Sequence, residues 1–166
     1  YKTLDSIHPS LINDYLKELE NKKILGLIIS IDSPGGSVAA TQIIYKQLNE
    51  FKKANKIPIY FHTNNILASG AYWISLASNK IYANYGAVIG SIGVKGPDWL
   101  YYNSPNSLSS GILGNSVESI NGIKLYSNIA GKSKDIFSPF RKPTIKEREH
   151  LQEIVDDIYE DFTNLV

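Results

Sequence analysis

Residues Ile24–Ser37 read ILGLIISIDSPGGS, and this stretch decides the fold class. Its first part, Ile24–Ile31, is an almost unbroken apolar run of strand length, which is typical of a parallel-sheet strand buried on both faces. Asp32–Ser37 then has the composition of a sharp turn. An amphipathic helix at Ala40–Phe51 and a second strand at Pro58–Phe61 follow. This order predicts one right-handed β-α-β crossover unit.

The same alternation continues on both sides of this unit. Apolar residues recur at helical spacing after Pro9 and predict a helix before the first strand. On the other side, a helix is expected to start at Ala68–Ala71, followed by short strands at Lys80–Ala83 and Ala87–Val94. The pattern therefore favours an α/β protein with a mostly parallel sheet flanked by helices.

The second half of the chain has a less regular pattern. Lys95–Asn121 is rich in Ser, Asn, Gly and Tyr without clear periodicity, and such long segments are usually functional or mobile. Ile123–Ile129 alternates as a strand does. Thr144, followed three residues later by Glu147, is a capping-box pattern and predicts a long C-terminal helix. We expect one domain over residues 1–166.

The composition excludes several classes of protein. The 166 residues are 43% hydrophobic and 20% charged, an ordinary globular mixture. Seventeen Lys and Arg against sixteen Asp and Glu give a net charge of +1, which does not favour nucleic acid as a partner. The absence of cysteine excludes disulfide scaffolds, thiolate metal sites and cysteine nucleophiles.

No run in the sequence is apolar and long enough to span a bilayer, and no secretory-type amino terminus is present. The chain begins at Tyr1 and contains no methionine. We therefore expect it to be a fragment of a longer chain.

One serine has the placement that a nucleophile needs. With cysteine absent, Ser and Thr are the candidates for acyl transfer. Ser69 follows a loop, opens a predicted helix and lies between Ala68 and Gly70. Its hydroxyl is expected at the edge of the sheet, where a helix N-terminus favours negative charge. The alternative is an ordinary N-cap, a role that serine often fills.

A second glycine-lined turn could complete a site. Gly35 and Gly36 follow the first strand, at a point where backbone N–H groups can face a ligand. The turn could equally be a plain strand-to-helix connection. A phosphate site is disfavoured, because neither the GxGxxG nor the GxxxxGK[ST] fingerprint occurs.

A serine hydroxyl also needs a base to take its proton. We interpret His8, His62 and His150 as surface or packed histidines, so a Ser-His-Asp triad is poorly supported. A lysine can act instead if burial lowers its pKa. Lys132 and Lys134 are the two candidates, and a solvated surface role is the alternative for each.

Four motifs together resemble the signal peptide peptidase A family of Ser/Lys proteases, of the S49 type. In chain order they are IDSPGGSV (Ile31–Val38), ASGAYWIS (Ala68–Ser75), IGSIGV (Ile89–Val94) and GKSKDIFSPFR (Gly131–Arg141). The resemblance runs from about Asp5 to Phe162. It implies a Clp-protease- and crotonase-like fold of repeated β-β-α units.

The resemblance also implies a serine endopeptidase that needs no metal or cofactor. Ser69 matches the nucleophile, Lys134 the general base and Gly36 one oxyanion donor, with Gly70 as the second. Signal peptides or other membrane-associated peptides are the implied substrates. The implied assembly is a homo-oligomeric ring in which neighbouring subunits share the dyad. The catalytic domain is then expected outside the cytoplasm, associated with the membrane through a segment not in this chain.

The chain departs from this family in one region, and three alternatives stay open. Ser69 and Lys134 are 65 residues apart, more than is usual, and Pro97–Asn121 lacks the family's short helix, which leaves substrate preference undefined. A Clp-like peptidase would need a histidine soon after the serine, whereas the next one is His150. A crotonase-fold protein that binds an acyl-thioester would need a glutamate base near Ala87–Val94. A non-catalytic binding module would leave Ser69 unreactive.

Overall fold

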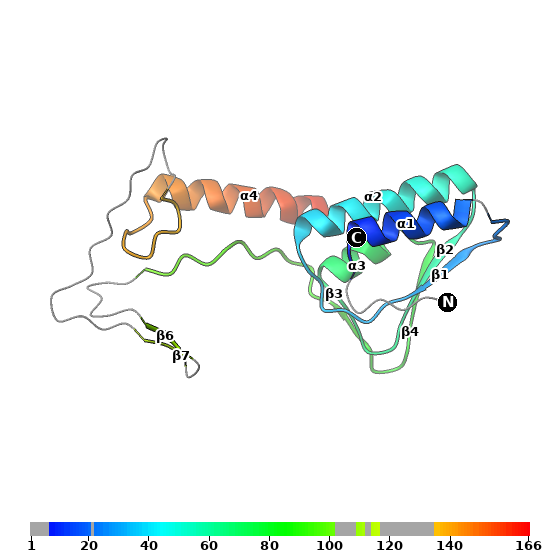
Figure 1. The fold of residues 1–166 in the computed structure, drawn as a ribbon, viewed down its shortest axis with the longest axis horizontal. Coiled ribbons are helices and arrows are strands. Elements are labelled where there is room, and N and C mark those ends of the chain that lie inside the picture. The colour runs from blue at the N-terminus through cyan, green and yellow to red at the C-terminus, as the bar shows by residue number, and fades with distance from the viewer. Residues whose placement is uncertain (1–6, 21, 102–108, 112–113, 117–134) are drawn as a thin grey trace. The chain divides into compact units, whose positions relative to one another are not determined.

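The computed structural model describes residues 7–20, 22–101, 109–111, 114–116 and 135–166 (Figure 1). The chain divides into two compact units: residues 1–94 with 157–166 form the first, and residues 95–156 form the second. The single domain that the sequence predicts over residues 1–166 stays a prediction.

The first unit alternates helices and strands. In chain order its elements are α1 (Pro9–Glu20), β1 (Leu27–Ser30), α2 (Val38–Asn55), β2 (Ile59–Thr63), β3 (Ile66–Ala68), α3 (Gly70–Ser75), β4 (Lys80–Ala83) and β5 (Val88–Gly90). This mixed α/β order confirms the predicted fold class.

Parallel strands form the two sheets of this unit. The order β1-β2-β4 makes one sheet, with Ile29 opposite Phe61 and Phe61 opposite Ile81. β3 and β5 make the other, with Leu67 opposite Ile89. A parallel bridge between Ser33 and Leu67 pairs the continuation of β1 with β3. The predicted β-α-β unit is confirmed, since β1 and β2 are parallel neighbours joined by α2.

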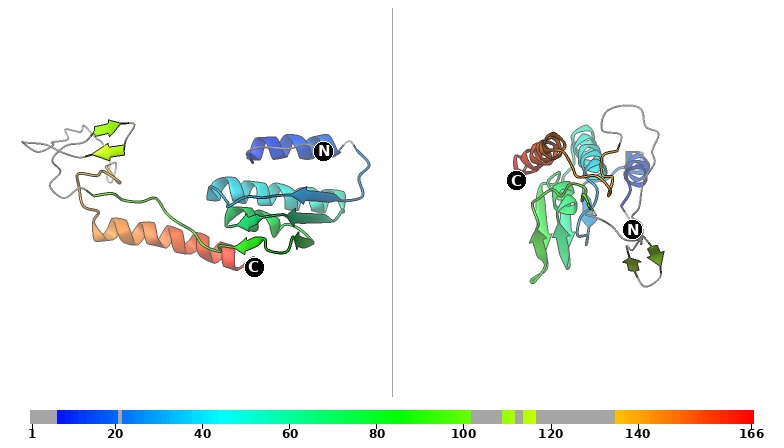
Figure 2. Two further views of the ribbon diagram at one scale, coloured as in Figure 1. Left: turned by 90° about the horizontal axis from the view of Figure 1, so that it is seen from below. Right: turned by 90° about the vertical axis from the view of Figure 1, so that its left-hand side faces the viewer.

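The hydrophobic core lies where the helices meet the inner face of the three-stranded sheet. Figures 1 and 2 show α2 over this sheet with α1 beside it. The buried core residues are Leu16, Ile31, Ile44, Leu48, Phe51, Ile59, Phe61, Leu67, Ala71, Ile74 and Ala77. They recur at helical spacing in α2 and alternate along β2. The amphipathic helix predicted at Ala40–Phe51 is confirmed: Ile44, Leu48 and Phe51 are buried, whereas Ile43 is 47% exposed.

The prediction that the first strand is buried on both faces is wrong for the residues that the structure describes. Side chains of β1 are alternately half-buried and exposed, and Ile28 is 76% exposed. Ile28 pairs with Tyr60, which pairs with Lys80 in β4, so these three lie on one face of the sheet. Burial on both faces requires cover on both faces, whereas the described helices pack on one.

Two further strands differ from the sequence prediction. The strand expected over Ala87–Val94 is limited to β5, because Gly90 and Ser91 adopt positive φ angles of 133° and 53° that end the extended conformation. β3 was not predicted at all. The strand predicted at Ile123–Ile129 lies outside the described residues.

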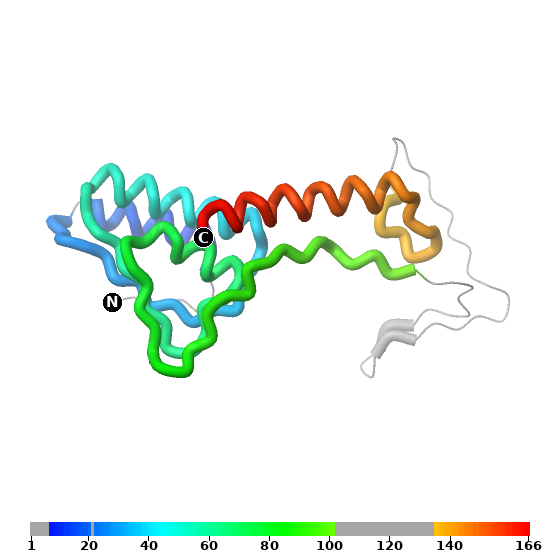
Figure 3. The backbone as a smooth tube through the Cα atoms, turned by 180° about the vertical axis from the view of Figure 1, so that it is seen from behind, coloured from blue at the N-terminus to red at the C-terminus, as the bar shows by residue number. Residues whose placement is uncertain are grey.

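The second unit contains a hairpin and the beginning of the last helix. β6 (Ser109–Gly111) and β7 (Gly114–Ser116) are antiparallel. Residues 91–101, which lead towards them from β5, form no regular secondary structure (Figure 3). α4 (Ile145–Thr163) begins in this unit and ends in the first.

The start of α4 confirms the predicted capping box. The Glu147 N–H donates to the Thr144 hydroxyl at 3.2 Å, and the Glu147 carboxylate accepts from the Thr144 N–H at 2.9 Å. At the other end of the helix, the Phe162 ring stacks on Trp73 of α3 with ring centroids 4.7 Å apart. Among the described residues, no helix is both long and apolar enough to cross a membrane.

Candidate active site

Ser69 lies in a tight turn between β3, which ends at Ala68, and α3, which begins at Gly70. Its φ is 50° and its ψ is −125°, an unfavourable conformation for a residue with a side chain. The Ser69 N–H donates to the Gly90 carbonyl at 2.9 Å, and this bond holds the turn against the end of β5. A strained strand-to-helix turn of this kind projects the side chain of its central residue away from the sheet.

The hydroxyl of Ser69 does not cap the helix. Ser69 occupies the N-cap position of α3, but its side chain makes no capping hydrogen bond. In contrast, Ser37 at the start of α2 has extended backbone angles and accepts from the Ala40 N–H. The half-buried Ser69 side chain therefore does not act as an ordinary N-cap, which is the alternative to a nucleophile in the sequence analysis.

The glycine turn after β1 touches the Ser69 turn. Gly35 has a φ of 112°, and a Cβ added there would lie 2.8 Å from the Ser69 Cβ and 2.9 Å from the Gly70 nitrogen. Both distances are shorter than any normal contact of a Cβ atom. Only glycine at position 35 allows the two turns to approach this closely.

Two backbone N–H groups lie next to this contact. The Gly36 nitrogen is 3.3 Å from the point where a Cβ at Gly70 would lie, and a Cβ there would also collide with the hydroxyl of Thr41 in α2. Within the described ranges, the Gly36 N–H donates to no backbone acceptor. Gly70 opens α3, so its N–H has no acceptor within the helix. Two such donors beside a helix N-terminus suit a developing oxyanion.

The structure thus brings together three of the four predicted site residues: Ser69, Gly36 and Gly70. The fourth, Lys134, lies outside the described residues, as does the other candidate, Lys132. Thr41 was missed by the sequence analysis. It lies among the apolar residues of α2, so the sequence gives no sign of a role. The structure shows that Thr41 is buried, with 3% of its surface exposed, and that its hydroxyl borders Gly70.

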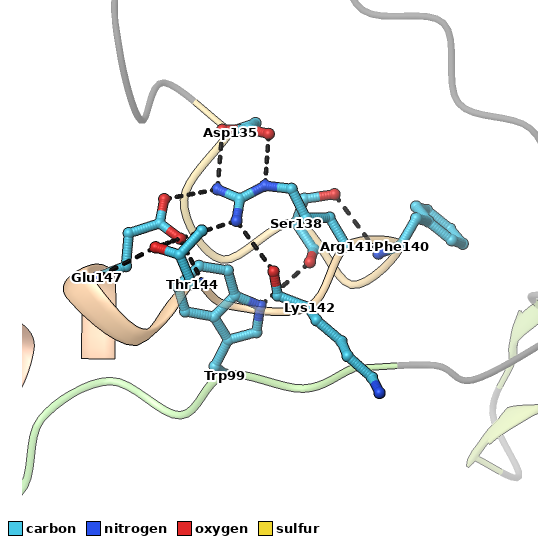
Figure 4. Close-up of polar contacts among 8 residues, drawn as sticks. All are labelled: Trp99, Asp135, Ser138, Phe140, Arg141, Lys142, Thr144 and Glu147. Carbon is cyan, nitrogen blue, oxygen red and sulfur yellow. Dashed lines mark hydrogen bonds and ion pairs between the residues drawn. The ribbon is translucent and has the colours of Figure 1, made fainter. Parts of the chain in front are cut away.

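The residues directly after Lys134 are held by Arg141 (Figure 4). Its guanidinium donates to both Asp135 oxygens, at 2.6 and 2.9 Å. It also donates to both Glu147 oxygens, at 2.8 and 2.7 Å. Such two-pronged pairs are strong and geometrically specific. They fix the turn that begins at Asp135 to the first turn of α4.

An aromatic residue completes this cluster. The Trp99 ring packs with the Arg141 guanidinium 5.3 Å from its centroid, and its indole N–H donates to the Ser138 carbonyl at 3.2 Å. Phe137 packs against the same ring at 5.2 Å. From sequence, Arg141 and Ser138 are placed only within the motif Gly131–Arg141. The partners Asp135, Glu147 and Trp99 were not foreseen.

The ion pairs set the charge of the cluster. Hydrogen bonds from Arg141, supported by the Thr144 N–H, lower the pKa of Glu147 to about 2. The Arg141 side chain likewise lowers the pKa of Asp135, and the two carboxylates raise the pKa of Arg141. All three groups are therefore ionised at neutral pH.

The three histidines make local contacts. His62 in β2 is 3.4 Å from the Asn84 amide oxygen, His8 is 2.9 Å from the Ser10 hydroxyl, and His150 lies 3.6 Å from Glu153. In the part of the chain that the structure describes, no group of three or more His, Asp or Glu side chains is placed to hold a metal ion.

Comparisons with known proteins agree with the motifs. The model of peptidase family S49 matches residues 51–166, a range that includes Ser69 and Lys134. A protein of Methanocaldococcus jannaschii whose name assigns it to the proteases is 32% identical over 173 residues, which cover 100% of this chain and 51% of that protein. A protein of Enterococcus faecium named for signal peptide peptidase A is 32% identical over 159 residues, covering 96% of this chain and 42% of that protein.

A chloroplastic serine protease of Arabidopsis thaliana is similar over a shorter stretch. It is 33% identical over 88 residues, which cover 53% of this chain and 13% of that protein. The chain spans about half the length of the first two relatives. Because the family model matches well over half of the sequence, the chain belongs to peptidase family S49.

Proposed function

We propose that this chain carries the catalytic residues of a serine endopeptidase with a Ser69–Lys134 dyad. One observation carries the proposal: Ser69 is held in a strained turn at the start of α3, with its hydroxyl unused for capping. The backbone N–H groups of Gly36 and Gly70 lie beside it. Membership of family S49 supports the reaction class.

In the proposed reaction, neutral Lys134 takes the hydroxyl proton while the Ser69 oxygen attacks the scissile carbonyl carbon. The N–H groups of Gly36 and Gly70 donate to the oxyanion that develops on the carbonyl oxygen. Protonated Lys134 then gives its proton to the leaving amine as the peptide C–N bond breaks. Water attacks the acyl-enzyme with Lys134 again as base, and the released carboxylic product frees Ser69.

The environment of a lysine base must favour its neutral form. An ordinary lysine pKa near 10.4 must fall by about three units for the amine to be neutral at physiological pH. A carboxylate paired with the lysine would oppose this fall. Asp135 is next in sequence, but both of its oxygens already accept hydrogen bonds from Arg141. This arrangement supports Lys134 as a base.

We further propose that copies of the chain form a ring in which one subunit's Lys134 acts beside the neighbour's Ser69. Ser69 belongs to the first compact unit and Asp135 to the second. A head-to-tail interface can close into a ring, and burial at that interface would supply the desolvation that the base needs. Signal peptides or other membrane-associated peptides are the proposed substrates, cleaved outside the cytoplasm.

Three variants of the full protein test the dyad. Ser69→Ala should lower hydrolysis of an unstructured peptide by about 10⁶-fold, as removal of a nucleophile does in other serine proteases. Lys134→Arg should be equally inactive, because a guanidinium stays charged. Lys132→Arg is the matched control and should retain activity. Wild-type activity should rise with pH through the lowered lysine pKa and survive chelators.

Labelling gives a second readout. A fluorophosphonate should attach to Ser69 in the wild type, as mass spectrometry of the labelled peptide would show. An unreactive Ser69, or full hydrolysis by Ser69→Ala, would reject the dyad in favour of a non-catalytic binding module or another nucleophile.

Complementation tests the shared site. Ser69→Ala and Lys134→Ala subunits are co-refolded, each inactive alone. In a randomly mixed ring, roughly a quarter of the sites should pair an intact serine with an intact neighbouring lysine. A verified mixed oligomer without activity would show that each dyad lies within one chain.

A further inference from the structure

We propose that Asp32 is a positioning residue that holds the glycine turn in register with Ser69, an inference that rests on the proposed function. Asp32 lies between β1 and the glycine turn and binds the turn between β2 and β3. Its Oδ1 accepts hydrogen bonds from the Thr63 hydroxyl (2.8 Å) and from the N–H groups of Asn64 (2.9 Å), Asn65 (2.7 Å) and Ile66 (3.3 Å).

The hydrogen bonds continue from Asp32 towards the site. The Ser33 N–H donates to the Ile66 carbonyl at 2.8 Å, and the Ala68 N–H donates to the Ser33 carbonyl at 3.1 Å. The Gly35 N–H then donates to the Ser33 hydroxyl at 3.2 Å. The two segments are therefore paired from the Asp32 carboxylate up to the contact between Gly35 and Ser69.

That contact leaves little tolerance for a shift in register. Gly35 has no room for even one more carbon atom beside Ser69, and Gly36 presents its N–H from the next position. Ser69 itself keeps a positive φ, which persists only where the surroundings enforce it. Catalytic groups must be held within about 0.5 Å of their productive geometry. Asp32 supplies such a restraint without touching the reacting atoms.

The chemistry of this position favours an ionised carboxylate. Five donors converge on Asp32, since the Asn64 side-chain amide also donates to its Oδ2 at 3.3 Å. The Asn65 N–H and then the Thr63 hydroxyl lower the pKa of Asp32 well below its usual range, so it is charged wherever a lysine base is neutral. Asparagine at position 32 would instead turn an NH₂ group towards the NH₂ group of Asn64.

This donor conflict provides a rescue experiment in the full protein. Asp32→Asn should lower kcat and the rate of fluorophosphonate labelling by about tenfold, less than loss of an oxyanion donor itself, with KM unchanged. Asn64→Asp should also lower both rates, because two carboxylates then face each other. The double variant Asp32→Asn/Asn64→Asp restores a donor opposite an acceptor and should recover most of the loss.

Asn84→Ala is the matched control. It removes the bond from the Asn84 amide to the Asn64 oxygen but leaves every contact of Asp32 in place, so its kcat should equal that of the wild type. Thermal melting verifies that each variant is folded. Wild-type kcat in Asp32→Asn, or a double variant no better than the single ones, would overturn the proposal.

Hydrogen exchange separates this inference from the proposed function. The Ser33 and Ala68 amides report the pairing directly, and in Asp32→Asn they should exchange about tenfold faster through local opening. Unchanged exchange would overturn the role of Asp32 whatever the activity. If wild-type Ser69 does not react with the probe, the proposed function fails, while faster exchange would still support the coupling of the two turns.

Discussion

The turn at Ser69 and the turn from Asp135 to Arg141 are held by different forces. Around Ser69, backbone hydrogen bonds and the absence of a side chain at Gly35 bring two chain segments into contact. Around Arg141, charged side chains that are 11% to 36% exposed form the contacts. The first turn should therefore be sensitive to added atoms, and the second to lost charge and low pH.

Of the changes that test this comparison, the largest effect is expected where an atom is added to the glycine turn that touches Ser69. Gly35→Ala forces a Cβ against Ser69 and Gly70, so the turns must separate and the oxyanion donors shift. We expect activity to fall by at least about 10²-fold, as on loss of an oxyanion donor. Measurement of kcat/KM for a peptide checks this.

The control for this variant is Gly86→Ala. Gly86 also has a positive φ, of 88°, but a Cβ there would meet no atom within 4 Å. The Gly86→Ala variant therefore has the backbone strain of a positive φ without any steric collision, and it should keep its activity. Equal losses in the two variants would mean that backbone strain, and not the contact with Ser69, is responsible.

A smaller effect should follow when strain in the Ser69 turn is released. Ser69→Gly and Ser69→Ala both remove the hydroxyl, but only glycine tolerates a φ of 50° without strain. In Ser69→Ala the backbone strain of about 1–3 kcal/mol remains, whereas in Ser69→Gly it is released at the entropy cost of a glycine. Ser69→Gly should therefore be more stable than Ser69→Ala by about 1 kcal/mol. Urea denaturation of the two variants measures this difference. A less stable glycine variant would contradict the assignment of strain to Ser69.

The smallest effect concerns pH at the Arg141 cluster. The pKa of Glu147 is lowered from 4.5 to about 2 by Arg141 and Thr144, so its contribution to stability is complete above about pH 4.5 and is lost as the pH falls towards 2. The protection of residues 135–147 against hydrogen exchange, corrected for the intrinsic exchange rate at each pH, should fall over this interval in the wild type. In Glu147→Gln the same segment should exchange faster at neutral pH, with a weaker dependence on acid.

Glu50→Gln provides the comparison for this variant. Glu50 pairs with Lys46 at 3.8 Å, and both side chains are mostly exposed, so its removal should leave exchange almost unchanged. A Glu147→Gln variant with wild-type acid dependence would show that Glu147 does not hold the second turn.

Local signals in the sequence predicted much of the first unit and the start of α4. The apolar periods of α1, α2 and β2, and the capping box of Thr144 and Glu147, depend on residues within a few positions of one another. Ser69 at a helix start and the glycine turn at Gly35–Gly36 were visible for the same reason. Their roles in catalysis stay predictions, as does that of Lys134.

The sequence by itself determined the α/β order and the placement of both turns, because turn residues and apolar periodicity act locally. Only the tertiary structure decided that Gly35 touches Ser69, that the Ser69 hydroxyl does not cap α3, and that Ile28 is exposed. It also decided that Asp32 binds the turn after β2. These features depend on hydrogen bonds and close contacts between residues far apart in the chain. No periodic pattern in the sequence predicts such contacts.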